Sequence, residues 1–130
     1  MDQHYIAVET FQYPIECFCS SSVHAYDLTI NRGDIMEITD EQKYTMDNGW
    51  YFLVKINERN NFYIPINDLE NFIRQEQLIA MLDIDLQINY LKFKIDQAFD
   101  TGDEASFRDY SKKLNESNEL KLKLERYLYI

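Results

Sequence analysis

The sequence predicts an α+β protein in which a small β-barrel over residues 1–72 is followed by an antiparallel helical hairpin over residues 73–130. Two observations predict this division. Up to about residue 72, short segments rich in aromatic and β-branched residues alternate with polar breakers, which is typical of strands and tight loops. From about residue 74, apolar residues recur every three or four positions, which is the period of a helix.

Five short segments of the first half are the candidate strands: HYIAVETF, LTI, DIMEIT, WYFLVKI and FYIPI. Polar stretches such as NRGD, MDNG and NERNN separate them. WYFLVKI is apolar at nearly every position, which suits a strand buried on both sides in a small barrel. NERNN has the length of a hairpin loop, so we expect tight connections between these strands.

A helix of roughly 25 residues is predicted at the start of the second half. One continuous apolar stripe with the spacing 3, 4, 3, 4, 3 consists of Met81, Ile84, Ile88, Leu91, Ile95 and Ala98. A second stripe beside it consists of Leu82, Leu86, Tyr90 and Phe93. Because a helix covered on one face needs only one stripe, we expect this helix to pack on its hairpin partner and also on the barrel or on another chain.

The segment FDTGDE is the predicted corner of the hairpin. Thr101 followed by Glu104 fits a capping box, and Asp103 lies in the first helical turn, where the helix dipole favours negative charge. Gly102 lets the chain turn without a side-chain clash. The second helix is expected from about Asp103 through Phe107, Tyr110 and Leu114 toward Leu124 and Leu128.

The net charge of −10 is concentrated in the first half. Residues 1–72 hold twelve acidic and four basic side chains, a net charge of −8, whereas residues 73–130 hold eleven acidic and nine basic ones, a net charge of −2. Without a basic patch, direct binding of nucleic acid or of an anionic membrane is not expected. The acidity suits a basic partner, or it serves solubility alone.

The chain has no apolar run approaching the roughly 18 residues of a membrane span. Its start, MDQHYIAV, lacks the basic and apolar regions of a signal peptide. We therefore expect a cytoplasmic protein.

No catalytic, metal or cofactor site is predicted. Cys17 and Cys19 are too close for an easy disulfide and too few for a structural zinc site, and His4 and His24 complete a ligand set only by a coincidence of the fold. The carboxylates between Asp96 and Glu104 lack the spacing of a calcium-binding loop. Because no phosphate-binding loop, HExxH pair or nucleophile elbow occurs, we expect a protein that is not an enzyme.

Aromatic side chains offer a candidate binding face on the barrel. Exposed rings between two loops of a small barrel form a shallow groove for proline-rich or other extended peptides, whereas buried rings fill the core of a small domain. Trp50 begins a strand directly after DNG, where a side chain tends to lie at a surface rim. The set consists of Tyr13, Tyr26, Trp50, Tyr51, Tyr63 and Pro65.

DLTINRGDIMEITDE, NGWYFLVKI and FYIPINDLENF together resemble the Src-homology-3 family over about residues 4–72. The matching residues are Leu28, Gly33, Asp34, Gly49, Trp50 and Pro65. The resemblance implies a five-stranded small barrel, with Trp50 and Pro65 in positions that line the family's peptide groove. The family's terminal groove tyrosine falls on Asp68 here, and its ALYDY opening has only the partial counterparts IAVETF and AYDL.

The stretch IDQAFDTGDEASFRDYSKKL resembles the IDEAL domain of low-GC Gram-positive bacteria, over about residues 78–117. The matching residues are Ile95, Asp96, Ala98, Asp100, Gly102, Asp103, Phe107 and Leu114, while Gln97 and Phe99 replace the Glu and Leu of the family's core. The resemblance implies an origin in such bacteria or their phages and a regulatory or interaction role. It supplies no catalytic residue.

Two functions from different classes follow. The first is a non-catalytic, adaptor-type interaction or regulatory protein that binds a protein partner, or a second copy of itself, through the hairpin, with the barrel groove as a further binding face. Here Asp96, Asp100 and Phe107 hold the hairpin corner. The candidate partner-binding residues are Tyr26, Trp50, Tyr63, Pro65, Ile84, Ile88 and Leu91.

The second function is an acidic inhibitor, encoded by a phage, that blocks a host protein by mimicking nucleic acid. Its binding would collapse with salt, as multi-ion contacts do. A small hydrolase is a third class, for which the sequence offers no named residue.

Overall fold

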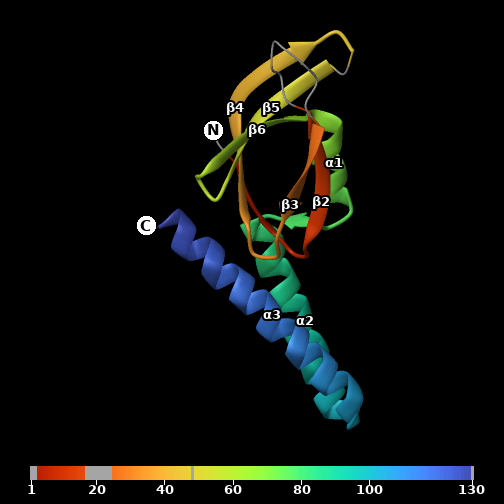
Figure 1. Cartoon of the computed structure of the whole chain (residues 1–130). Helices are drawn as coiled ribbons and strands as arrows, with labels where there is room; N and C mark the ends of the chain where they lie inside the picture. Colours follow the sequence, from red (N-terminus) through yellow and green to blue (C-terminus); the bar gives the residue numbers. More distant parts are fainter. Residues whose placement is uncertain (1–2, 17–24, 48, 130) are drawn as a thin grey trace. The chain divides into compact units, whose positions relative to one another are not determined.

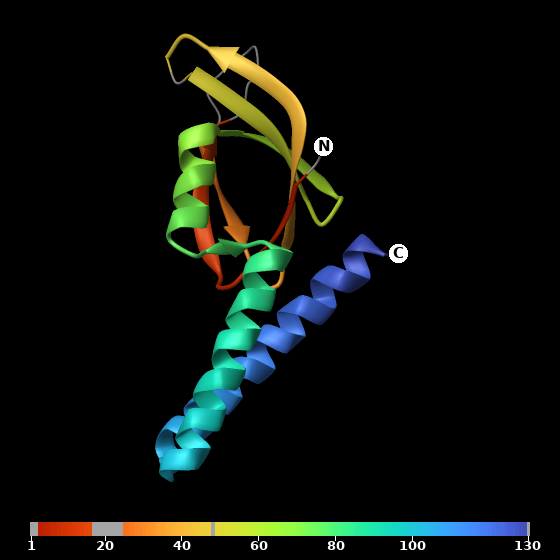
Figure 2. The same ribbon diagram turned by 180° about the vertical axis from the view of Figure 1, so that it is seen from behind.

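The computed structural model describes residues 3–16, 25–47 and 49–129 of the chain. The chain divides into two compact units, Met1–Ile79 and Ala80–Ile130. The first unit contains the strands and one short helix, and the second contains two long helices (Figures 1 and 2). This arrangement confirms the predicted α+β class. The boundary lies after residue 79, whereas the sequence pattern changes at residue 72.

The first unit has a main sheet of five strands in the order β6-β5-β4-β1-β7 and a separate two-stranded sheet, β2-β3. The strands are β1 (Gln3–Ala7), β2 (Phe11–Glu16), β3 (Ala25–Ile30), β4 (Ile35–Thr45), β5 (Gly49–Ile56), β6 (Asn60–Pro65) and β7 (Leu78–Ile79). The helices are α1 (Ile66–Arg74), α2 (Met81–Thr101) and α3 (Glu104–Leu128). Neighbouring strands in both sheets pair in the antiparallel direction.

A polar network holds the turn between β5 and β6 against the start of β4. Asn57 and Glu58 have positive φ angles of 53° and 60°, as both central residues of a type I′ turn require. The Asn57 side chain accepts a hydrogen bond from the Ile35 N–H at 2.9 Å and donates one to Asp34 Oδ1 at 3.1 Å. Residues 57–59 therefore form the hairpin loop predicted within NERNN, and Asn57 also positions β4.

Gly33 lies between β3 and β4 in the chain and is hydrogen-bonded to β1. Its φ of 89° is one that side-chain-bearing residues rarely adopt. Its N–H donates to the Ala7 carbonyl at 2.8 Å, and the Ala7 N–H donates to the Asp34 carbonyl at 2.9 Å. The Gly33–Asp34 pair thus fixes the entry of the chain into β4.

The core of the first unit draws residues from the main sheet, from β3 and from α1. It contains Ala7, Ile30, Met36, Val54, Ile56, Ile64, Leu69, Phe72 and Leu78. Burial of these side chains is the main favourable term in forming the unit, because each fully buried large aliphatic or aromatic side chain contributes roughly 1.5–3 kcal/mol. On α1, Phe72 packs its ring against Phe11 and Tyr13 of β2, with ring centroids 5.1 and 5.2 Å apart.

The sequence pattern predicts neither α1 nor β7. Helix α1 spans nine residues and begins directly after Pro65, whose φ of −57° is compatible with a helix start. Its apolar residues, Ile66, Leu69, Phe72 and Ile73, span only about two turns, which is too short to establish a period. Strand β7 has two residues and exists because Ile6 and Ala7 of β1 pair with it.

The second unit is a helical hairpin, as predicted. Helices α2 and α3 have 21 and 25 residues and run side by side in both views (Figures 1 and 2). Gly102, with a φ of 71°, ends α2 in the left-handed conformation that favours glycine. The predicted turn at this residue is therefore confirmed.

Candidate functional site

The outer face of α2 carries four large apolar side chains that are exposed to solvent. Leu82, Leu86, Tyr90 and Phe93 retain 69, 59, 55 and 62% of their accessible surface. We call these four residues the outer stripe. Contiguous exposed apolar residues of this size mark an interaction surface more often than isolated ones do.

The buried residues of α2 form a second set, the inner stripe, which consists of Ile84, Ile88, Leu91 and Ala98. Each retains 5% or less of its accessible surface. Successive residues of an α-helix are rotated by about 100°, so the two stripes lie on opposite sides of α2. The prediction of two adjacent stripes is thus wrong, although the prediction of two apolar faces is confirmed.

The structure corrects the use proposed for Ile84, Ile88 and Leu91. The sequence predicts that these residues bind a partner, but they are buried in the hairpin, where α3 supplies Ser117, Leu120 and Leu124 to the buried set. A side chain with 5% or less exposure has no surface to offer to a partner. The outer stripe, on the opposite side of α2, is the apolar surface that remains exposed.

Two polar contacts set the register between α2 and α3. Lys121 Nζ lies 2.7 Å from Asp85 Oδ1, and the Ser117 hydroxyl lies 3.3 Å from Gln87 Oε1. The hydrogen bond to Asp85 raises the pKa of Lys121, because it stabilises the charged ammonium. Both contacts flank the inner stripe, so they align the helices that bury it.

The hairpin corner is capped differently from the prediction. Thr101 is the last residue of α2, and its hydroxyl donates to the carbonyls of Gln97 at 3.0 Å and Ala98 at 3.3 Å. The N-cap of α3 is Asp103, which accepts hydrogen bonds from the Ser106 backbone N–H at 3.1 Å and the Ser106 hydroxyl at 2.7 Å. These two bonds lower the pKa of Asp103. The capping box at Thr101 is therefore wrong, because the helix continues one residue further than the motif requires.

Two phenylalanines flank this corner. The rings of Phe99 and Phe107 lie 6.4 Å apart, and Phe99 keeps 73% of its surface exposed. Together with Ala98, Gly102, Asp103 and Glu104 they line a shallow cavity. Phe107 contributes to the corner as predicted, whereas Asp96 and Asp100 are exposed residues of α2.

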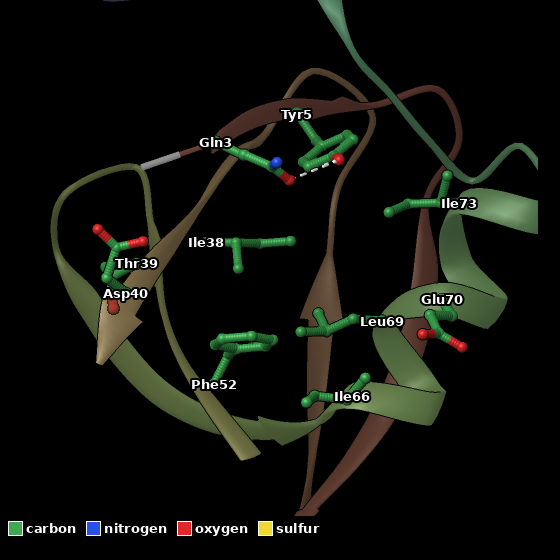
Figure 3. A pocket seen from close by; sticks show the side chains of 10 residues that line it. All are labelled: Gln3, Tyr5, Ile38, Thr39, Asp40, Phe52, Ile66, Leu69, Glu70 and Ile73. Carbon is green, nitrogen blue, oxygen red and sulfur yellow. Dashed lines mark hydrogen bonds between the residues drawn. The ribbon is translucent and has the colours of Figure 1, made fainter. Parts of the chain in front are cut away.

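A second cavity, of about 240 Å³, lies in the first unit between α1 and the inner face of the main sheet (Figure 3). Ile66, Leu69 and Ile73 of α1 point toward Tyr5, Ile38 and Phe52 of the sheet. The polar lining residues are Gln3, Thr39, Asp40 and Glu70, and the Tyr5 hydroxyl donates to Gln3 Oε1 at 3.1 Å. The lining of the cavity is thus mostly apolar, and it includes the two acidic residues Asp40 and Glu70.

Sequence reasoning missed this cavity because α1 supplies one of its walls. The only signal was the spacing of Ile66, Leu69 and Ile73 in the segment that follows Pro65. The sequence pattern places Ile66 and Leu69 at the end of the barrel and Ile73 at the start of the hairpin half.

The aromatic residues predicted to bind a partner do not gather on one face. In the β5-β6 pairing, Tyr63 lies opposite Leu53, and Pro65 lies opposite Tyr51. Since successive residues of a strand point to opposite faces, Trp50 lies on the other face from Tyr63 and Pro65. Trp50 is half exposed and instead contacts Tyr44, with ring centroids 5.2 Å apart.

The remaining aromatic candidates have separate surroundings. Tyr26 pairs with Ile15 in the β2-β3 sheet, and its side chain is outside the described part of the structure. The Tyr63 ring lies beneath Lys43 Nζ at 5.7 Å. The Tyr13 hydroxyl donates a hydrogen bond to Asp68 Oδ2. Asp68 stands where the Src-homology-3 resemblance expects a groove tyrosine, and here it accepts a hydrogen bond from a different tyrosine.

Within residues 3–16, 25–47 and 49–129, no three His, Cys, Asp or Glu side chains gather into a group that can hold a metal ion. Cys17, Cys19 and His24 lie outside those residues. His4 is paired with Glu37, with Nε2 and Oε1 3.4 Å apart. In the same described segments, no helix has the length and apolarity needed to cross a membrane.

In a comparison with known families, the model of the IDEAL domain matches residues 84–114. The matched segment contains most of α2, the corner and the first part of α3, and it includes Leu86, Tyr90 and Phe93 of the outer stripe. No curated protein and no solved structure matches the chain. The resemblance of the first unit to the Src-homology-3 family stays a prediction.

Proposed function

We propose that this protein is a non-catalytic interaction protein that binds another protein through the outer stripe of α2. The observation that carries the proposal is the opposite placement of the two stripes. The inner stripe already accounts for the packing of α2 on α3, so the hairpin itself does not need a second apolar face. A partner surface that covers the outer stripe removes its apolar side chains from water, and this burial favours binding.

The expected gain is moderate. Full burial of a Leu or Phe side chain contributes roughly 1.5–3 kcal/mol. The side chains of the outer stripe are already partly covered, so each contributes roughly 1 kcal/mol on binding. Four such contributions, opposed by the loss of translational and rotational freedom, favour a reversible complex.

For the first unit we propose a Src-homology-3-like barrel that serves as a second contact surface. The five strands of its main sheet agree in number with the barrel that the resemblance implies. Its cavity beside α1 is of a size to accept one apolar side chain, and Asp40 and Glu70 favour a cationic residue next to it. The proposed ligand is therefore an extended peptide with an apolar residue flanked by Lys or Arg, bound by the cavity rather than by a groove at Trp50.

The corner carboxylates support a role without catalysis. Asp103 is occupied as the cap of α3, and the bonds from Ser106 that lower its pKa stabilise a helix rather than a reacting group. We also propose, from the IDEAL resemblance, a regulatory role in a low-GC Gram-positive bacterium or its phage.

The test is affinity capture with a matched pair of variants, using an extract of such a bacterium. Leu86→Glu places a charge in the middle of the outer stripe. Met46→Glu adds the same charge at a residue of the first unit that is 94% exposed. We expect a bound protein that Met46→Glu retains and Leu86→Glu loses. Equal capture by both variants would overturn the proposed role of the outer stripe.

The same capture, repeated at low and high salt, separates the rival function. An inhibitor that mimics nucleic acid would use the charge of −8 on residues 1–72. Its partner would be lost at high salt and be indifferent to Leu86→Glu, because multi-ion contacts are screened whereas apolar contacts are not.

A further inference from the structure

The charges beside the outer stripe are arranged so that the stripe is complementary to itself. Asp83 and Lys94 lie about three turns apart on one flank of the stripe, and Asp85 and Lys92 lie about two turns apart on the other. On each flank the acidic residue belongs to the first half of the stripe and the basic residue to the second half. The four apolar residues lie between these flanks.

From this pattern we infer that α2 pairs with α2 of a second copy of the chain, antiparallel and about a two-fold axis. This inference rests on the proposed function, and it names the partner of the outer stripe. In an antiparallel pair related by a two-fold axis, the same flank of both helices meets, with the direction reversed. The acidic half of one copy then faces the basic half of the other.

The register of the pair follows from the positions along α2. With the axis near residues 87 and 88, Leu82 lies opposite Phe93 of the second copy, and Leu86 lies opposite Tyr90. The same register places Asp83 opposite Lys94 and Asp85 opposite Lys92. A parallel pair about a two-fold axis would instead bring the two different flanks together, with Asp83 near Asp85 and Lys94 near Lys92 of the second copy, where like charges repel.

The residues on the Asp83–Lys94 flank are free to make these contacts at small cost. Asp83 is exposed. Within the described residues, Lys94 makes two weak contacts: its Nζ is 3.4 Å from Gln97 Oε1 and 5.7 Å from the centroid of the Tyr90 ring. Asp85 on the other flank already pairs with Lys121, so substitutions there would also disturb the hairpin.

The experiment is sedimentation equilibrium of the full chain over a concentration series up to about 1 mM, a range suited to a small interface. We expect the mass to rise from the 15.7 kDa of one chain to twice that value. Leu86→Glu should weaken the dimer by at least about a hundredfold, because it would bury a charge against an apolar partner. Circular dichroism checks that this exposed position leaves the helices intact.

Charge variants test the antiparallel register. Lys94→Glu and Asp83→Lys should each weaken the dimer by about tenfold, since each turns two attractive pairs into repulsive ones. The double variant D83K/K94E should regain the affinity of the natural chain. An equimolar mixture of the two single variants should form heterodimers. Lys123→Glu makes the same charge change at an exposed position of α3 and serves as the control.

Three results would overturn the inference. A monomer at every concentration would mean that the stripe does not bind its own copy, and capture sensitive to Leu86→Glu would then leave the proposed function standing with a different partner. A dimer that Leu86→Glu does not weaken would place the interface elsewhere. Single charge variants that dimerise like the natural chain would exclude the antiparallel register.

Discussion

The inner and outer stripes of α2 are built from similar residues but have different surroundings. Each contains large aliphatic side chains at helical spacing, yet one is 5% or less exposed and the other is more than half exposed. The difference lies in α3, which covers one side of α2 only. The comparison shows that the period of a sequence defines the faces of a helix, whereas the neighbouring element decides which face is core and which is surface.

The largest expected effect separates the stripes by stability. Leu91→Ala removes a buried side chain and should lower the free energy of unfolding of the hairpin by about 3 kcal/mol. Leu86→Ala, the matched change in the outer stripe, should alter it by less than about 0.5 kcal/mol at concentrations where the chain is monomeric. Urea unfolding followed by helical circular dichroism measures both. Similar losses for the two variants would mean that the outer stripe is also covered within the chain.

A smaller effect is expected at the corner that brings the inner stripe against α3. Asp103→Ala removes the side-chain cap of α3 and should lower the melting temperature of the hairpin by a few degrees. Thr101→Ala should have less effect, because the Thr101 hydroxyl donates to carbonyls of α2 and does not cap α3. Thermal unfolding compares the two, and a larger loss from Thr101→Ala would restore the capping box that the sequence suggests.

The cap should also show a defined pH dependence. Hydrogen bonds from Ser106 hold the pKa of Asp103 below its usual value near 3.8, so their stabilisation is fully present above that value. It is lost as the pH falls through the lower folded-state pKa, where the carboxylate becomes protonated. The difference in melting temperature between the natural chain and Asp103→Ala should therefore be constant near neutral pH and shrink below about pH 4. A difference that persists unchanged at pH 2 would assign it to another cause.

The smallest effect is expected for the ion pair beside the inner stripe. Asp85 and Lys121 are both partly exposed, so water and salt screen their attraction. A double-mutant cycle with Asp85→Ala and Lys121→Ala should give a small coupling that diminishes as salt is added. A large coupling that salt does not change would mean that this pair, and not the inner stripe, dominates the packing of α2 on α3.

Much of the hairpin could be predicted because its signals are local and repeated. The positions of Ile84, Ile88, Leu91 and Ala98 establish a period over about four turns of helix, and Gly102 marks the end of α2. The strands β4, β5 and β6 follow in the same way from apolar segments and the NERNN loop. The predicted capping box failed because Thr101 and Asp103 both suit a helix start, and only the length of α2 chooses between them.

The candidate surfaces were harder to predict, because a surface is defined by what does not cover it. Ile84 and Leu86 are equally apolar in the sequence, and the choice of Ile84 as a partner-binding residue was wrong because α3 covers it. The Src-homology-3 resemblance assigns both Trp50 and Pro65 to one peptide groove, but the pleat places their side chains on opposite faces of a sheet. The cavity in Figure 3 joins β1, β4, β5 and α1, which are distant in the chain.

By itself, the sequence determined the α+β class, the hairpin and its corner glycine, and the two apolar faces of α2, because these follow from contacts between residues a few positions apart. Only the tertiary structure decided that β7 is a strand, that Asp103 caps α3, that Tyr13 bonds to Asp68, and that the outer stripe rather than the inner one meets solvent. Those outcomes depend on which distant segments pack together, and burial is a property of the neighbours rather than of the residue.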